Sequence, residues 1–304
     1  MKSFVTLMLC LLSMTTFAQV HDEITSAMEE FDYDKVINLI SPGTKDSLLL
    51  STRIQALKAM NRYPEAIVDL TSLFVKDTTD TKILIDLAEC YKLMGSPRQA
   101  ADYYRKAVSL RPNNKFFRLQ YIRSLLNAEN FKEARDACHG WLEQDTVSAT
   151  GYKYLGQAYE GMQDIPNAFF SYNVAYRRDS LDAQTVARIA NIFNNNRQFT
   201  DAIDVTECYR LSDTTSVDVN RQNAKAYCML KDYKKAIERY ESLKRMGDRS
   251  FLTFYYLGIS YYGDNWFYGS YDNLKEAYAK NSTDINVLYL SLIHISEPTR
   301  LGMI

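Results

Sequence analysis

Apolar residues recur along this chain at a constant interval of 34 residues. The interval is clearest in six alanines, which are Ala66, Ala100, Ala134, Ala168, Ala202 and Ala236. When each unit is counted so that this alanine is position 20, successive units begin at residues 47, 81, 115, 149, 183, 217 and 251. Apolar residues then recur at positions 4, 7, 8 and 11, and again at positions 20, 24 and 27, which is the spacing of one helical face. The pattern predicts two amphipathic helices in every unit.

Side-chain size alternates within each predicted helix pair. Position 8 is mostly small, as in Ala88 and Gly156, whereas positions 11 and 24 are mostly large, as in Tyr91 and Tyr104. Small residues let two helix axes approach closely, and large rings fill the space beside them. Because a single pair leaves part of its apolar surface exposed, the units are expected to stack on their neighbours. We therefore expect an all-α protein made of antiparallel helix pairs.

These features resemble the tetratricopeptide repeat family. The unit at residues 81–114 carries the family's signature at nearly every position, namely Leu84, Leu87, Ala88, Tyr91, Gly95, Ala100, Tyr104, Ala107 and Pro112. The resemblance covers residues 47 to about 290 and implies a right-handed superhelical solenoid. Four residues depart from the pattern: Arg53 and Asn223 at position 7, Thr206 at position 24 and Ser270 at position 20. The units that contain them are expected to be less stable.

The segments before the repeats have a different character. Residues 1–18 predict a signal peptide, because Lys2 supplies a positive start, residues 4–14 are almost all apolar, and Ala18 is a small residue suited to cleavage. A permanent anchor is the alternative, although the run is short for a membrane span and no other stretch reaches about 18 apolar residues. Residues 19–46 predict an N-terminal helical cap, and residues 47–291 predict about seven repeats and the start of an eighth. We expect no stable membrane insertion of this part.

The end of the sequence breaks the repeat pattern. Residues 292–304 lack the small residue due at position 8, place Pro298 where a first helix should end, and read like the translation of a transposase sequencing adapter. We interpret this segment as a non-native tail. The sequence is then truncated, and we expect the natural protein to continue beyond Ser291.

Composition argues against an enzyme. The 36 Lys and Arg residues balance 37 Asp and Glu residues, so the chain lacks the basic excess of a nucleic-acid binder. Its 3 histidines are far apart, its 11 glycines form no phosphate-binding loop, and no Ser/His/Asp or Cys/His grouping is present. We expect no catalytic residue, metal, cofactor or small-molecule substrate. A buried free thiol is the expectation for Cys138, which occupies the packed position 24, and a disulfide between Cys208 and Cys228 is the alternative to free thiols there.

The resemblance also implies where a partner binds. In this family the first helix of each unit lines a concave groove, chiefly at positions 2, 5, 9, 12 and 13. These positions nominate Arg123, Asn127, Lys153, Gln157, Asn191, Asn194, Arg221, Lys225, Tyr255 and Tyr262. Amides, cations and rings on one face suit an extended peptide or protein segment, and an ordinary solvated helix face is the alternative. The two-cation, two-asparagine arrangement by which some relatives hold a terminal carboxylate is not reproduced in register.

These observations leave two main classes of function open. The first is an exported protein–protein interaction scaffold, and the resemblance places such proteins in the periplasm or cell envelope of Gram-negative bacteria. The second is the extracytoplasmic sensor or adaptor half of a larger signalling protein, whose C-terminal membrane and effector part is missing. An enzyme with a missing catalytic domain is a third possibility, and no residue of the sequence supports it.

Overall fold

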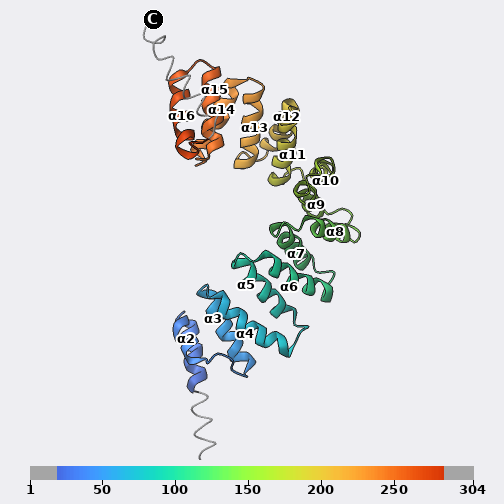
Figure 1. Cartoon of the computed structure of the whole chain (residues 1–304), viewed down its shortest axis with the longest axis vertical. Helices are drawn as coiled ribbons and strands as arrows, with labels where there is room; N and C mark the ends of the chain where they lie inside the picture. Colours follow the sequence, from blue (N-terminus) through green and yellow to red (C-terminus); the bar gives the residue numbers. More distant parts are fainter. Residues whose placement is uncertain (1–18, 284–304) are drawn as a thin grey trace, which may run out of the picture. The chain divides into compact units, whose positions relative to one another are not determined.

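The computed structural model describes residues 19–283, in which every regular element is a helix (Figure 1). Residues 19–29 are helical. They are followed by α2 (Tyr33–Leu39), α3 (Ser47–Ala59), α4 (Tyr63–Lys76), α5 (Thr81–Leu93), α6 (Pro97–Leu110), α7 (Lys115–Asn127), α8 (Phe131–Leu142), α9 (Ala149–Gly161), α10 (Ile165–Arg178), α11 (Ala183–Asn195), α12 (Phe199–Arg210), α13 (Val217–Met229), α14 (Tyr233–Arg245), α15 (Phe251–Gly263) and α16 (Phe267–Lys280). The predicted signal peptide, the start of the eighth repeat and the predicted non-native tail lie outside the described residues.

The observed helices confirm the prediction of two helices per repeat. The first helix of each repeat, from α3 to α15, begins at the residue where the sequence register begins a unit. A capping residue precedes each of these helices and accepts hydrogen bonds from its first backbone N–H groups. These caps are Asp46, Asp80, Asn114, Ser148, Asp182, Ser216 and Ser250. The start of each first helix is therefore encoded locally.

The turn between the two helices has the same backbone conformation in every repeat. Position 15 has a positive φ, between 57° and 72°, in Asn61, Gly95, Glu129, Gln163, Arg197, Lys231 and Asn265. The residue after it closes the end of the first helix, as where the Asp164 N–H donates to the Tyr159 carbonyl at 2.9 Å. Gly95 is the one glycine among the seven. The other six residues adopt the left-handed backbone conformation that favours glycine.

Helix packing within a repeat follows the alternation of side-chain size. All six of the periodic alanines at position 20 are fully buried. A methyl group on Gly156, at position 8, would lie 2.6 Å from the ring of Tyr172, at position 24, and one on Gly258 would lie 2.7 Å from Leu274. The absence of a side chain at position 8 therefore lets a large residue of the second helix lie directly against the first helix.

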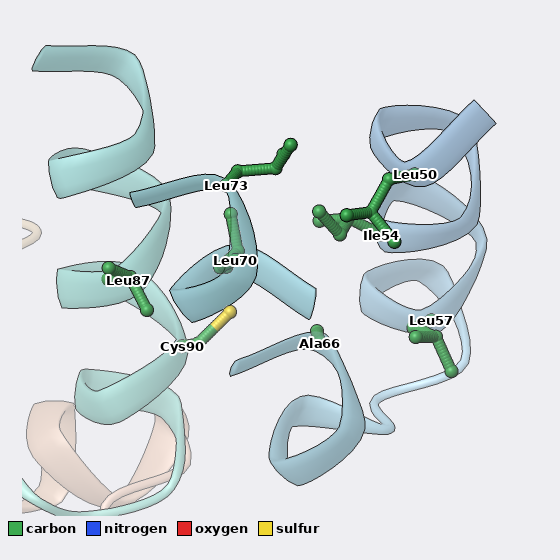
Figure 2. Close-up of a cluster of buried hydrophobic side chains, with 8 residues drawn as sticks. All are labelled: Leu50, Ile54, Leu57, Ala66, Leu70, Leu73, Leu87 and Cys90. Carbon is green, nitrogen blue, oxygen red and sulfur yellow. The ribbon is translucent and has the colours of Figure 1, made fainter. Parts of the chain in front are cut away.

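The described chain divides into two compact units, one ending at Ala137 and the other beginning at Cys138. In the first unit, a buried apolar cluster joins α3, α4 and α5 (Figure 2). Its members are Leu50, Ile54, Leu57, Ala66, Leu70, Leu73, Leu87 and Cys90. A second cluster joins Ile24 and Ala27 of the N-terminal helix to Val36, Ile40 and Ala56 of the elements that follow. The helical segment before α3 thus shares a core with the first repeat.

The second unit has its own apolar clusters. One joins α13, α14 and α15 through Ala224, Tyr227, Cys228, Ala236, Tyr240, Leu243, Leu257 and Tyr261. Another joins Ala168 and Tyr172 of α10 to Ile189 and Ile192 of α11. Both of these clusters include residues from two consecutive repeats, so the sixth repeat shares a core with the seventh and the fourth with the fifth.

Three of the four polar residues that depart from the repeat pattern have identified polar partners. Arg53 forms a buried ion pair with Asp69. In the second unit, Asn223 Nδ2 donates to Thr206 Oγ1 at 2.9 Å, and Arg239 Nε donates to Asn223 Oδ1 at 3.2 Å. Buried polar groups are costly mainly when they lack partners. Two of the departures, at position 7 of the sixth repeat and position 24 of the fifth, therefore compensate each other.

Candidate functional site

First helices of consecutive repeats are joined by a recurring polar contact. Position 12 of one first helix bonds to position 6 of the next. On α9 and α11, Arg188 Nη1 donates to Glu160 Oε1 at 3.0 Å, and on α11 and α13, Asn194 Nδ2 donates to the Gln222 carbonyl at 3.0 Å. We call the side chains that α9, α11, α13 and α15 leave outside the apolar core the first-helix surface of the second unit.

The direction of these helices follows from two neighbouring contacts. Asn194 bonds to Gln222, while Asn195 Oδ1 accepts from Lys225 Nζ at 3.3 Å. A step forward along α11 therefore corresponds to a step forward along α13, so the two helices run in the same direction. Side chains at corresponding positions of successive first helices consequently form rows across this surface.

Two of the nominated cations pair with acidic residues that precede the next first helix. Lys153 Nζ lies 3.0 Å from Asp182 Oδ1, and Asp182 is the N-cap of α11. Arg221 lies 2.9 Å from Asp248 Oδ2, just before α15, and 2.8 Å from Asp218 Oδ1 on its own helix. Both cations therefore tie one repeat to the next, which is a structural role that family resemblance did not predict.

The acidic partners in these pairs, Asp182 and Asp248, accept several hydrogen bonds from protein groups. Partial burial alone would raise the pKa of Asp182, but hydrogen bonds from Thr185 and Lys153 hold it below its ordinary value. Burial of Asp248 is likewise outweighed by hydrogen bonds, including one from Thr253, and the pKa of its carboxyl is also lowered. Both carboxylates thus stay charged and keep the cations engaged.

Lys225 differs from these two cations. It is half-buried on α13, and its one hydrogen bond within the described residues goes to the neutral Asn195 side chain. Burial lowers the pKa of Lys225, because no nearby carboxylate offsets the loss of water. Asn191 lies one turn before Asn195, is also half-buried, and has no side-chain hydrogen bond to any described residue. These two nominated side chains remain available to a ligand.

One nominated amide is buried, which differs from the prediction, and another is half-buried. Asn194 is 4% exposed, and its amide group is used to bond α11 to α13, so it does not line an open surface. The reason is that position 12 lies where successive first helices meet. Gln157 is half-buried, and its Nε2 is fully buried with no hydrogen-bond partner in the described part of the chain.

The nominated aromatic residues lie on the last described first helix. Tyr255 stacks on Phe251 with ring centroids 5.6 Å apart. Tyr262 packs edge-on against Phe267 at 5.7 Å and is 39% exposed. The surface thus changes from amides and cations on α9, α11 and α13 to rings on α15.

Two further surface residues were not nominated from the sequence. Leu252 occupies position 2 of the seventh repeat and Met229 position 13 of the sixth, and they are 47% and 45% exposed. Both stand at positions that the family uses for binding, so the repeat register could have identified them.

The first unit carries its own first-helix residues. Arg123 and Asn127 are exposed on α7. A hollow of about 550 Å³ lies at α3, α4 and α5, and its lining includes Ser51, Gln55 and Lys58, which occupy positions 5, 9 and 12 of the first repeat. First-helix positions therefore do line a hollow surface in this unit.

The described residues offer no metal-binding or catalytic grouping. Between residues 19 and 283, no three His, Cys, Asp or Glu side chains gather closely enough to hold a metal ion. The four cysteines in the same range are free thiols, of which Cys208 is exposed and the other three are buried. None of the helices in this range combines the length and the apolar character that a membrane crossing requires.

Comparison with known proteins agrees with this architecture. A family model described as "Tetratricopeptide repeat" matches residues 81–114, which is one complete unit of the sequence register. A curated protein from Dictyostelium discoideum, named DnaJ homolog subfamily C member 7 homolog, is 34% identical over 137 residues. That match spans 45% of this chain and 23% of the relative, so the chain corresponds to about a quarter of that protein.

Solved structures with the same fold cover most of the chain. A tetratricopeptide repeat protein from Parabacteroides merdae has a TM-score of 0.55 at 13% identity, covering 81% of this chain and 99% of its own. The C-terminal part of a repeat protein from Cytophaga hutchinsonii has a TM-score of 0.56 at 17% identity, and the match covers 77% of this chain and 96% of that protein chain. YrrB, described as having an unusual peptide-binding site, has a TM-score of 0.53 at 14% identity, and the match covers 62% of this chain and 98% of the YrrB chain.

The described chain is thus an all-α helical repeat protein. Its period, its paired helices and the matched unit support the tetratricopeptide repeat family, and the similar structures have the same fold. Proteins with this architecture generally bind other proteins or peptides and are generally not enzymes.

Proposed function

We propose that this chain is an exported protein–protein interaction scaffold that binds an extended segment of a partner on its first-helix surfaces. The observation that carries the proposal concerns two side chains at binding positions: among the described residues, Lys225 has no carboxylate partner and Asn191 has no side-chain hydrogen bond. An extended segment has backbone carbonyl and N–H groups that such side chains can bond. The hollow at α3, α4 and α5 is a second surface of the same kind.

The similar proteins support the choice of ligand. The structure of YrrB is described as having a peptide-binding site, and its fold is similar to that of this chain. A peptide ligand is therefore the first class to test here.

Capture of a partner provides the test. We expect the double variant Asn191→Ala, Lys225→Ala to recover less partner from an envelope extract than the unmodified chain does, with helicity and melting nearly unchanged. The control variant Lys234→Ala, Arg245→Ala removes two exposed cations from α14, a second helix. Equal recovery by the unmodified chain and both variants would contradict binding at the first-helix surface.

Export is a separate part of the proposal and rests on residues 1–18. A positive start, an apolar run and small residues at the end of the segment support cleavage after Ala18 and release into the periplasm or cell envelope. N-terminal sequencing of the protein made in a Gram-negative host is expected to begin at Gln19. A mature protein that still begins at Met1 and fractionates with the cytoplasm would contradict export.

A further inference from the structure

The cations of the first helices in the second unit are not equivalent. The helices α9, α11, α13 and α15 carry four of them, namely Lys153, Arg188, Arg221 and Lys225. Three are paired with carboxylates at 3.0 Å or less. Lys225 has no carboxylate partner within the described residues, so it is the cation on this surface whose charge the array does not neutralise.

The first unit contains a comparison that shows what pairing does. Burial would lower the pKa of Lys58, but the hydrogen bond to Asp86 and the charges of Asp86 and Glu89 raise it above its ordinary value. Lys225 has a similar degree of burial and a lowered pKa, with loss of water as the cause. A half-buried cation of this kind gains most from an anion that arrives with a ligand, because such an anion would restore the interactions lost with water.

The surroundings of Lys225 are apolar on one side. Cys228 Sγ on α13 lies 3.9 Å from the Tyr256 carbonyl on α15. Lys225 is one turn before Cys228, and Leu252 is one turn before Tyr256. Leu252 is thus near the same level of α15 as Lys225 is of α13, and it is 47% exposed. Met229, one turn after Lys225 on α13, adds a second exposed apolar side chain.

The other side of Lys225 is polar. Asn195 Oδ1 accepts from Lys225 Nζ, and the Nδ2 group of the same amide makes no hydrogen bond within residues 19–283. An ammonium group and an amide N–H at one place match the acceptor oxygens of a carboxylate. The exposed leucine and methionine match a large apolar side chain next to that carboxylate.

We propose that the surface of α11, α13 and α15 selects partner segments in which an acidic side chain lies beside a large apolar side chain. The acidic group binds Lys225 and Asn195, and the apolar group covers Leu252 and Met229. This inference rests on the proposed function, and it adds the chemical class of the segment that binds.

Selection from a library of short random peptides tests this inference. The library is displayed on phage and selected against the immobilised chain, and one enriched peptide is synthesised for affinity measurements. We expect enriched peptides to carry Asp or Glu near a large apolar residue. We also expect Lys225→Glu to lower the affinity for the synthetic peptide about tenfold. Lys234→Glu makes the same charge change on the exposed part of α14 and is expected to change affinity less than about twofold.

Two additional measurements keep the test independent of folding. Lys225→Met retains the buried methylene groups of the side chain and removes the charge, so it should fold normally and still lose most of the affinity. Exchanging the acidic residue of the peptide for lysine should restore binding to Lys225→Glu. Restored binding would show that the two charges face each other.

The outcomes separate this inference from the proposed function. Enriched peptides without an acidic residue, or equal binding by Lys225→Met and the unmodified chain, would overturn the inference and leave peptide binding intact. Failure to enrich any peptide over bare support would contradict peptide binding itself and therefore both proposals.

Discussion

Three buried tyrosines at position 24 allow a matched test of how hydrogen bonding affects the stability of this array. Tyr104, Tyr172 and Tyr240 are all fully buried. The Tyr172 hydroxyl donates to Glu160 Oε2 at 2.7 Å. The hydroxyls of Tyr104 and Tyr240 are buried with no hydrogen-bond partner among the described residues. The same substitution, tyrosine to phenylalanine, should therefore have opposite consequences at Tyr172 and Tyr240.

The expected magnitudes follow from these environments. Tyr172→Phe removes a hydrogen bond to a charged acceptor, which typically contributes about 1.5–3 kcal/mol. Glu160 is partly exposed and also accepts from Arg188, so we expect the lower end, a loss of about 1.5 kcal/mol. The Tyr240 hydroxyl loses its hydrogen bonds to water on folding and gains no partner among the described residues. Tyr240→Phe should therefore leave the free energy of unfolding unchanged or raise it by up to about 1 kcal/mol.

Urea denaturation followed by circular dichroism measures the difference. Long repeat arrays need not unfold in one step, so amide hydrogen exchange on α9–α10 and α13–α14 provides a local measure in each variant. We expect the two variants to differ by about 2 kcal/mol, with Tyr240→Phe the more stable. Equal losses in both variants would refute the argument, because they would show that the ring environment and not the hydroxyl partner decides the outcome.

Three further predictions concern the turn, the packing and the pH dependence. Gln163→Gly should stabilise the array by about 0.5–1 kcal/mol, because φ is 63° at this residue, and a melting temperature equal to or below that of the parent would contradict it. Ala168→Leu should cost about 1–3 kcal/mol in urea denaturation, because this position is fully buried, and an unchanged midpoint would contradict the packing. The folded-state pKa of Asp248 is lowered, so its contribution to stability is present above its unfolded pKa of about 4 and is lost as the pH falls through the folded value. Asp248→Asn should therefore be less stable than the unmodified chain at neutral pH, and its free energy of unfolding should fall less as the pH is lowered. Parallel profiles of unfolding free energy against pH for the variant and the unmodified chain would refute this.

The sequence predicts the helices of this protein well because their signals are local. The period of 34 residues places every first helix, and capping residues such as Asp182 and Ser216 fix the starting points. The small residue at Gly156 predicts the close approach of Tyr172 because only a side chain of negligible volume allows it. Each of these features depends on residues of one repeat.

Features that depend on two repeats were harder to predict. The family positions correctly indicate the first helices, but they do not show that Asn194 is used between α11 and α13 or that Arg221 is held by Asp248. These pairings depend on which residue the next repeat supplies. Lys225 was nominated together with Arg221, and only the structure shows that the two cations differ in their partners.

The pairing of Asn223 with Thr206 limits how this array could have grown. A gene that lengthens by copying one 34-residue unit normally produces a new junction that resembles the old ones. Here, a copy of any repeat other than the fifth, inserted between α12 and α13, would separate the buried Asn223 amide from the Thr206 hydroxyl and the Glu207 carboxylate. Insertion of a different repeat at the boundary between the fifth and sixth repeats would therefore remove two hydrogen bonds of a buried amide.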